Sequence, residues 1–248
     1  MYAIIGGSGL AKLTVLEAPR RQVMRTPYGE PSGALTFGRL AGADVVFLAR
    51  HGYGHTLAPH EINYRANIWA LKELKVEGVI SVATVGGIRA DLGPGVLVLP
   101  DQIIDYSHSR KATFFEGSEN PVIHVDFTLP YASSLRAALL AAAARCGEPL
   151  VDGGVYGCTQ GPRLETAAEI ERIARDGGDM VGMTGMPEAV LAREAGLAYA
   201  TLGVVVNHAA GRGTSREQIR LEELDRVMSE TVTRAVRILL AFFGGADA

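Results

Sequence analysis

The hydrophobic positions along the chain fall into short runs rich in β-branched residues, which alternate with longer segments of helical periodicity. Because helices that cover both faces of a largely parallel sheet give this alternation, we expect an α/β fold. A turn over residues 40–43 separates two strand-like runs and predicts a hairpin, so the sheet should be mixed. The expected strands are 2–5, 34–38, 44–49, 78–83, 96–99, 151–158, 180–181 and 198–206.

The expected helices follow several of these strands, at 63–74, 135–145, 165–175, 187–195 and 220–243. In the first of them, Ile68, Leu71 and Leu74 share one face. No segment has the composition of a linker, and 248 residues can bury one sizeable core. Residues 1–248 are therefore expected to form a single domain.

Composition narrows the possible partners and the location. The 24 basic and 27 acidic residues nearly cancel, so no global field would gather nucleic acid or an anionic membrane. Cys146 and Cys158 stand apart without a partner motif, which suits a reducing compartment and predicts a cytoplasmic protein. No apolar run reaches the roughly 18 residues of a membrane span, and the chain begins on a strand rather than on a secretory leader.

Small and polar residues gather where the predicted strands end. Gly6-Gly7-Ser8 follows the first strand, Arg50 and His51 follow the third, and Thr84 and Thr184 follow two later ones. Each has an ordinary alternative, a structural turn or a surface pair. Ligand sites of open α/β sheets lie at these strand ends, however, and backbone N–H groups, hydroxyls and a guanidinium suit an anion. Their recurrence predicts one crevice that binds phosphate.

Other polar residues are open to more than one interpretation. Three histidines within residues 51–60 raise a metal hypothesis, but no carboxylates or cysteines complete a ligand pattern, so no metal is expected. Glu165 is either a first-turn acid favoured by a helix dipole or a ligand acceptor. Met183 is either core or a ligand contact, and Asn207 either ends a strand or holds a purine edge.

Taken in order, these motifs resemble the trimeric purine nucleoside phosphorylase family, especially its methylthioadenosine phosphorylase branch. The resemblance implies a twisted mixed sheet surrounded by helices, a homotrimer, and inorganic phosphate as co-substrate with no cofactor. It spans almost the whole chain and is carried by GGSGL (6–10), ARHG (49–52), NYRANIWALK (63–72), TVGG (84–87), GPRLET (161–166), GMTGMPEAVLAREAGL (182–197) and VVN (205–207).

The resemblance also implies roles for individual residues. Those expected to hold phosphate are Ser8, Arg50, His51, Ala83, Thr84 and Thr184. Those expected to take part in catalysis are Asn207, Arg50, His51 and Thr184. The nucleoside is expected to meet Met183, Glu165, Asn207, His208, Ala209, Ile219, Leu221, Leu224 and, donated across a subunit interface, His124.

Departures from the methylthioadenosine branch indicate the substrate. That branch has an aspartate at Asn207 and a small hydroxyl residue at Glu165, whereas this chain matches phosphorylases for 6-oxopurines. A 6-oxopurine carries N1–H, which a carboxylate accepts, while a 6-aminopurine presents a bare acceptor there. Near the last helix, Ile219, Leu221 and Leu224 replace the histidine that meets a ribose 5′-hydroxyl, which suits an apolar methylthio group.

The leading expectation is therefore phosphorolysis of S-methyl-5′-thioinosine to hypoxanthine and 5-methylthioribose 1-phosphate, in purine and methylthio salvage. Methylthioadenosine, or plain inosine and guanosine, are alternative substrates for the same reaction. A nucleosidase that uses water and a non-catalytic nucleoside-binding protein are disfavoured, because neither needs a phosphate site.

Overall fold

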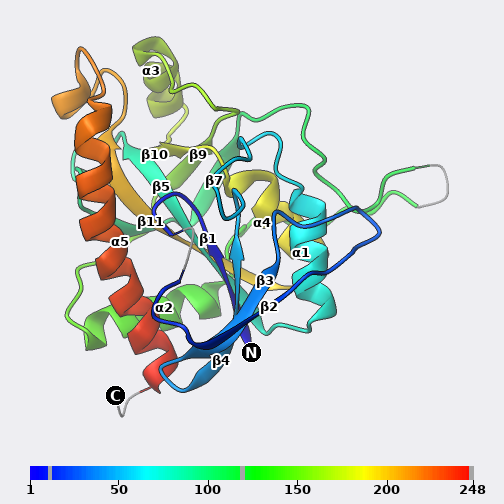
Figure 1. Ribbon diagram of the computed structural model, residues 1–248. Coiled ribbons are helices and arrows are strands. Elements are labelled where there is room, and N and C mark those ends of the chain that lie inside the picture. Colours follow the sequence, from blue (N-terminus) through cyan, green and yellow to red (C-terminus); the bar gives the residue numbers. More distant parts are fainter. Residues whose placement is uncertain (11–12, 118–120, 246–248) are drawn as a thin grey trace.

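The computed structural model describes residues 1–10, 13–117 and 121–245, with the backbone alone for Leu221 and Glu223. Within this part of the chain, eleven strands form one mixed sheet, which confirms the predicted α/β class (Figure 1). The main path runs β2-β3-β4-β1-β5-β10-β9-β7, and β11 pairs with β5 and β6 while β6 also pairs with β8. The strands are β1 (Tyr2–Gly6), β2 (Glu17–Gln22), β3 (Leu35–Leu40), β4 (Ala43–Ala49), β5 (Gly78–Gly87), β6 (Leu97–Leu99), β7 (Gln102–Asp105), β8 (Val151–Asp152), β9 (Val155–Cys158), β10 (Met180–Gly182) and β11 (Ala198–His208).

The predicted hairpin is confirmed, and two strands are additional to those expected. β3 and β4 pair antiparallel, and Ala41 and Gly42 between them have φ values of 46° and 82°, as a two-residue hairpin turn requires. β2 was missed because it is an exposed edge strand with the sequence EAPRRQ, which has no hydrophobic alternation. β7 was missed as well, and the expected strand 151–158 is divided into β8 and β9 by Gly153 and Gly154.

The α-helices of the described residues begin and end within two positions of the predicted bounds, whereas the short 3-10 helix was not predicted. Asn63 caps α1 through its side chain, which accepts from the Ala66 amide at 3.1 Å. Thr166 and Glu169 form a capping box at the start of α3. The helices are α1 (Tyr64–Glu73), α2 (Ser133–Arg145), α3 (Ala167–Arg175), α4 (Gly185–Glu194) and α5 (Leu221–Gly244), with a short 3-10 helix η1 (Gly213–Ser215).

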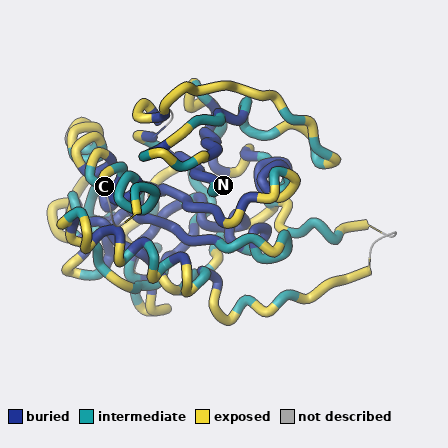
Figure 2. The backbone as a smooth tube through the Cα atoms, turned by 90° about the horizontal axis from the view of Figure 1, so that it is seen from below, coloured by how far each residue is buried: buried dark blue, intermediate teal, exposed yellow. Residues whose placement is uncertain are grey.

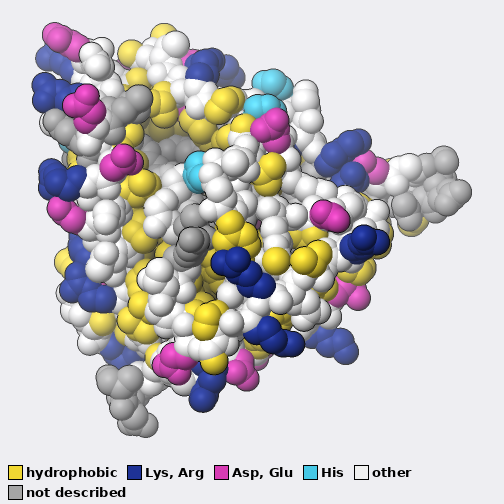
Figure 3. Space-filling view, viewed as in Figure 1, with side chains coloured by type: hydrophobic (Ala, Val, Ile, Leu, Met, Phe, Trp, Pro, Cys, Tyr) yellow, Lys and Arg dark blue, Asp and Glu magenta, His cyan; other side chains and the backbone are white. Residues whose placement is uncertain are grey.

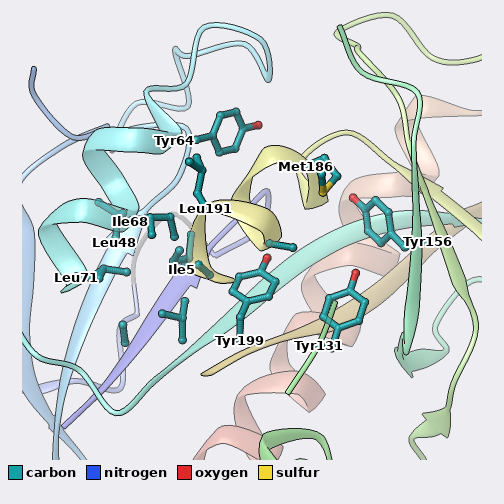
Figure 4. Packing of buried hydrophobic residues seen from close by; sticks show 14 of the residues in the cluster. Ile5, Leu48, Tyr64, Ile68, Leu71, Tyr131, Tyr156, Met186, Leu191 and Tyr199 are labelled. Carbon is teal, nitrogen blue, oxygen red and sulfur yellow. The ribbon is translucent and has the colours of Figure 1, made fainter. Parts of the chain in front are cut away.

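Two hydrophobic layers enclose the sheet. Ile5 packs in the layer beneath α1 and α4, with Leu71 and Leu191 (Figure 4). Ile4 belongs to the opposite layer, with residues of α2 and α5 such as Leu139. Neighbouring residues of β1 serve opposite layers because successive side chains of a strand point to opposite faces. The central strands are consequently buried on both sides (Figure 2).

The parallel strands bring distant parts of the sequence to one edge of the sheet. β1 pairs parallel with β4 and β5, and β5 pairs parallel with β11. Their carboxyl ends therefore meet, as expected for a ligand site in a sheet of this kind. On the outer surface, acidic and basic side chains are interspersed over the face seen in Figure 3, so any concentrated field must be local.

Candidate active site

A cavity of about 500 Å³ opens where β1, β4, β5 and β11 end. Its wall also includes the turn from β10 into α4, the loop after β9, and the first turns of α5. The structure thus brings together most of the residues that the sequence analysis selected. Those that line the cavity are Ser8, Arg50, His51, Ala83, Thr84, Glu165, Met183, Thr184, Asn207, Ala209 and Leu224.

The glycines after β1 allow the chain to bend closely around the cavity. The Gly7 amide donates to the Val82 carbonyl at 3.1 Å, which continues the ladder between β1 and β5. A Cβ on Gly7 would lie 2.7 Å from Nη1 of Arg50, so a larger residue would displace the guanidinium. Ser8 follows at once and is half-buried in the cavity wall.

Arg50 is fully buried, and its fork is occupied by protein groups. Its Nε donates to Glu188 Oε2 at 2.7 Å and its Nη2 to Glu188 Oε1 at 2.9 Å. Nη2 also donates to Ser81 Oγ at 2.5 Å, and Nη1 to the Val82 carbonyl at 3.2 Å. The bidentate clamp expected for phosphate is thus formed with Glu188 instead, and only the second hydrogen of Nη1 is left for another acceptor.

Glu188 completes a buried polar network beneath the cavity. Its Oε1 also accepts from the Tyr199 hydroxyl at 2.8 Å, and the residue is 0% exposed. Burial alone lowers the pKa of Arg50, but the charge and hydrogen bonds of Glu188 outweigh burial and raise that pKa above its ordinary value. Arg50 therefore stays charged, and because it is paired with Glu188 it adds no unpaired positive charge to the cavity.

His51 is held in one tautomer. Its Nδ1 lies 2.8 Å from the Leu57 carbonyl, which can only accept, so Nδ1 carries the hydrogen. Burial and the positive charge of Arg50 lower the pKa of His51 to about 4. The ring is then neutral at pH 7 and its other nitrogen carries a lone pair. That lone pair suits acceptance of a hydrogen from a protonated phosphate oxygen.

The turn between β10 and α4 places Met183 and Thr184 side by side in the wall. Thr184 is the N-cap of α4, and its hydroxyl makes no capping hydrogen bond to the helix. The turn packs tightly on Tyr156, since a Cβ on Gly182 would lie 2.2 Å from the Tyr156 hydroxyl. The glycine is needed there because the backbone rests directly on that ring.

Glu165 is free of the helix-start role that its position suggested. Thr166 is the N-cap of α3 and Glu169 its first-turn acid, so Glu165 precedes the helix. Its carboxylate lies in the cavity wall and accepts from Thr159 Oγ1 at 2.5 Å. Burial raises the pKa of Glu165 above the ordinary value of a glutamate.

Asn207 reaches the cavity at an irregularity in β11. The register with β5 shifts between Val205 and Asn207, as in a β-bulge. The Asn207 Nδ2 donates to the His208 carbonyl at 2.6 Å, which fixes the orientation of the amide. One N–H and the side-chain oxygen remain for a ligand.

Three of the expected nucleoside contacts do not line the cavity of this chain, and a fourth falls outside the described side chains. His208 turns to Thr214, whose Oγ1 lies 3.0 Å from its Nδ1, and Ile219 is not part of the described wall. His124 is exposed on the segment between β7 and α2. The side chain of Leu221 lies outside the described residues.

Other wall residues were not selected from the sequence. Val206 precedes Asn207 in β11, and Asp225 and Met228 follow Leu224 on α5. The helical spacing of Leu224 and Met228, four residues apart, would have indicated that both face the same side. Arg110 is not part of the wall, but it supports it by donating to the carbonyls of Met183 at 2.8 Å and Gln160 at 2.7 Å. No motif surrounds Arg110, so no sequence signal indicated it.

Three further observations concern metal binding, the neighbouring histidines and membrane-spanning helices. No group of three or more histidine, cysteine, aspartate or glutamate residues in the described part of the chain could hold a metal ion. The His51 and His55 rings lie 4.5 Å apart and tilt against one another. Nor does any helix of the described residues have the length and apolar character required to cross a membrane.

Comparison with known proteins agrees with the expected resemblance. The chain is 51% identical over 230 residues to a probable S-methyl-5′-thioinosine phosphorylase of Pseudomonas syringae pv. tomato, which covers 93% of each chain. It is 47% identical over 244 residues to a 6-oxopurine nucleoside phosphorylase of Pyrococcus furiosus, with 96% of this chain and 90% of that one covered.

The fold matches solved structures as well. A methylthioadenosine phosphorylase from Schistosoma mansoni in complex with adenine superposes with a TM-score of 0.92 at 31% identity, covering 98% of this chain and 90% of that one. The sequence model of the Phosphorylase superfamily matches residues 1–244. Motif order, fold and cavity therefore lead to the same assignment, and the chain belongs to the phosphorylase superfamily.

Proposed function

We propose that the chain cleaves S-methyl-5′-thioinosine with inorganic phosphate, giving hypoxanthine and 5-methylthioribose 1-phosphate. The observation that carries this proposal is one cavity lined by Glu165, Asn207, Leu224 and Met228. The first two suit a 6-oxopurine and the last two suit an apolar 5′ group. The names of the Pseudomonas and Pyrococcus relatives support the same substrate class.

Base selection follows from hydrogen-bonding capacity. An ionised Glu165 accepts N1–H of hypoxanthine but repels the lone pair at N1 of adenine. Asn207 keeps one N–H and its oxygen for the base, because its other N–H is donated to the His208 carbonyl. Donation from Asn207 to N7 strengthens as the departing purine gains negative charge, so this contact favours the transition state.

The sugar end is expected to lie against α5 and the β10–α4 turn. Leu224 and Met228 offer apolar surface to a methylthio group, and Met183 packs on the ribose. Leu164, 42% exposed at the rim, offers an aliphatic contact to the base. This apolar end favours sulfur and methyl over a hydroxyl, whose hydrogen bonds to water would be lost.

The reaction is expected to pass through an oxocarbenium-like ribosyl group. Phosphate bound beneath the sugar stabilises its positive charge and then attacks C1′ from the face opposite the base. The glycosidic bond breaks, its electrons go to the purine, and the new bond joins C1′ to a phosphate oxygen. Ser8, Thr84, Thr184 and backbone N–H groups would hold the phosphate, with His51 accepting its hydrogen.

One observation favours a second substrate, unmodified inosine. Asp225 lines the cavity beside Leu224, and a carboxylate there could accept a hydrogen bond from a ribose 5′-hydroxyl. The reaction and the base contacts would be the same. Direct comparison of the two nucleosides distinguishes them.

We further propose that the active form is a cytoplasmic homotrimer. Val122 is 78% exposed and Ile123 44% exposed beside His124, on a segment that projects from the body (Figure 1). Exposed aliphatic side chains on a projecting segment favour burial against another subunit. His124 would then reach a neighbouring active site. Size measurement in solution tests the assembly.

The experiment for the proposed reaction is product analysis with and without phosphate. With methylthioinosine, hypoxanthine and a sugar phosphate should appear only when phosphate is present. Thr184→Val should raise the KM for phosphate roughly tenfold, because one hydroxyl contact is lost. Thr233→Val is a matched control, since that hydroxyl donates to the Ser229 carbonyl on the exposed face of α5. Hypoxanthine release at an equal rate without phosphate would show a hydrolase instead.

A further inference from the structure

The carboxylate of Glu165 stands between two cavities. On one side is the substrate cavity, and on the other is a neighbouring cavity of about 640 Å³ bordered by β7, α3 and the loop after β9. Among the described residues, Glu165 alone lines both. Thr159 lines only the neighbouring cavity, so it approaches the carboxylate from the side away from the substrate.

The backbone of Thr159 is fixed on both sides. Its N–H donates to the Gly182 carbonyl at 2.8 Å, which extends the parallel pairing of β9 with β10 by one residue. Its carbonyl accepts from Arg110 Nη2 at 3.2 Å. Arg110 Nη1 also donates to the Met183 carbonyl at 2.8 Å, so the same guanidinium joins this loop to the ribose side of the cavity. The position of the Thr159 hydroxyl is consequently set by the sheet.

That hydroxyl has two acceptors within reach and one hydrogen to give. Its Oγ1 lies 2.5 Å from Glu165 Oε1 and 3.3 Å from the Gly182 carbonyl. The shorter contact, to a group that can carry negative charge, is the stronger one. Glu165 Oε1 therefore accepts a hydrogen bond from the side of the neighbouring cavity. Glu165 Oε2 is left to contact the substrate.

We propose that Thr159 is a positioning residue for base selection, which holds Glu165 through Oε1 and presents Oε2 to N1–H of a 6-oxopurine. This inference rests on the proposed function and adds a residue that does not touch the substrate. Hydrogen bonding to an ionised carboxylate favours the charged form, so the contact also keeps Glu165 in the state that accepts N1–H.

Other charged groups around Glu165 are already engaged or lie further along the neighbouring cavity. Arg163 and Glu169 pair with each other, Nη2 to Oε1 at 2.7 Å, and the Tyr106 hydroxyl donates to Asp176 at 2.7 Å. The remaining titratable or charged residues that line this cavity are Asp105, His108 and Arg172. A His108→Gln variant removes the one imidazole among these groups and serves as the control for it.

The test compares Thr159→Val, which removes the hydroxyl at nearly constant volume, with Thr159→Ser, which keeps it. Thr159→Val should lower kcat/KM for methylthioinosine roughly tenfold and leave the KM for phosphate unchanged, while Thr159→Ser stays within about threefold of the parent. The acid limb of the kcat/KM profile should move to higher pH in Thr159→Val, because the ionised carboxylate loses a donor. Thr159→Ser should restore the parent limb, and His108→Gln should not move it.

A second background isolates the route through Glu165. In Glu165→Gln the charge is gone, so adding Thr159→Val should cost less than threefold. An equal loss in both backgrounds, or an unmoved acid limb, would overturn the positioning role. The proposed function has a separate readout, since a parent enzyme that prefers methylthioadenosine refutes the substrate assignment whatever Thr159 does.

Discussion

Removal of the Arg50 side chain should destabilise the fold more than an ordinary active-site substitution. Arg50→Ala removes the guanidinium that pairs with the carboxylate of Glu188, a residue that is 0% exposed. Of the donors described above, only the Tyr199 hydroxyl then remains for this carboxylate. Breaking a buried pair by removing one partner costs about 3–5 kcal/mol. Each kcal/mol lowers Tm by roughly 2–4 °C for a chain of this size, so we expect Tm to fall by roughly 6–20 °C.

Thermal and urea unfolding of Arg50→Ala, Glu188→Gln and a surface control measure this effect. Arg226→Ala is the control, because it breaks an i,i+4 pair on α5 whose side chains are 70% and 63% exposed, and should cost no more than about 0.5 kcal/mol. The double variant Arg50→Met with Glu188→Leu should recover most of the lost stability, since it removes both charges. An unchanged Tm in Arg50→Ala, together with weaker phosphate binding, would show that Arg50 serves the ligand rather than the fold.

Three further predictions address the ligand contacts. Leu224→His should shift preference from methylthioinosine towards inosine by about tenfold, measured as a ratio of kcat/KM, since a polar donor replaces apolar contact. Asn207→Asp should lower kcat for methylthioinosine by roughly 10²-fold, because the donor to N7 is lost. Addition of Glu165→Ser should move selectivity further towards methylthioadenosine. If the ratio of kcat/KM for methylthioinosine over methylthioadenosine is the same in all variants, these base contacts are refuted. In the folded protein His51 stays neutral until the pH falls to its pKa of about 4, whereas in the unfolded chain it gains a proton near pH 6.5. The free energy of unfolding should therefore fall as the pH decreases from about 6.5 to about 4. His51→Asn should flatten that slope in urea titrations at pH 4 to 7.

The elements of the fold could be predicted where periodicity was strong. β5, β11 and α1 are largely buried, so their hydrophobic patterns identify them. β2 could not be predicted, because an exposed edge strand rich in arginine is specified by its pairing with β3 rather than by burial. The same limit applies to β7, which ends the strand path on the other side and has no fully buried residue.

The candidate site divides in a similar way. Residues at strand ends, such as Ser8, Arg50 and Thr184, could be placed because parallel strands end at one edge. The partner of Arg50 could not be predicted, because Glu188 lies 138 positions away and its place in the sequence is typical of an acidic residue in the first turn of a helix. Thr159 carries no motif and acts through its distance to Glu165, which only the folded chain determines.

Competition between nucleosides tests the enzyme's choice of substrate most directly. With saturating phosphate and equal concentrations of methylthioinosine, methylthioadenosine, inosine and guanosine, the rates at which each base is released give the ratios of kcat/KM. We predict that hypoxanthine from methylthioinosine is formed fastest, because Glu165 selects the 6-oxopurine and Leu224 with Met228 selects the methylthio group. Faster release of adenine from methylthioadenosine would contradict the assignment of base recognition to Glu165 and Asn207.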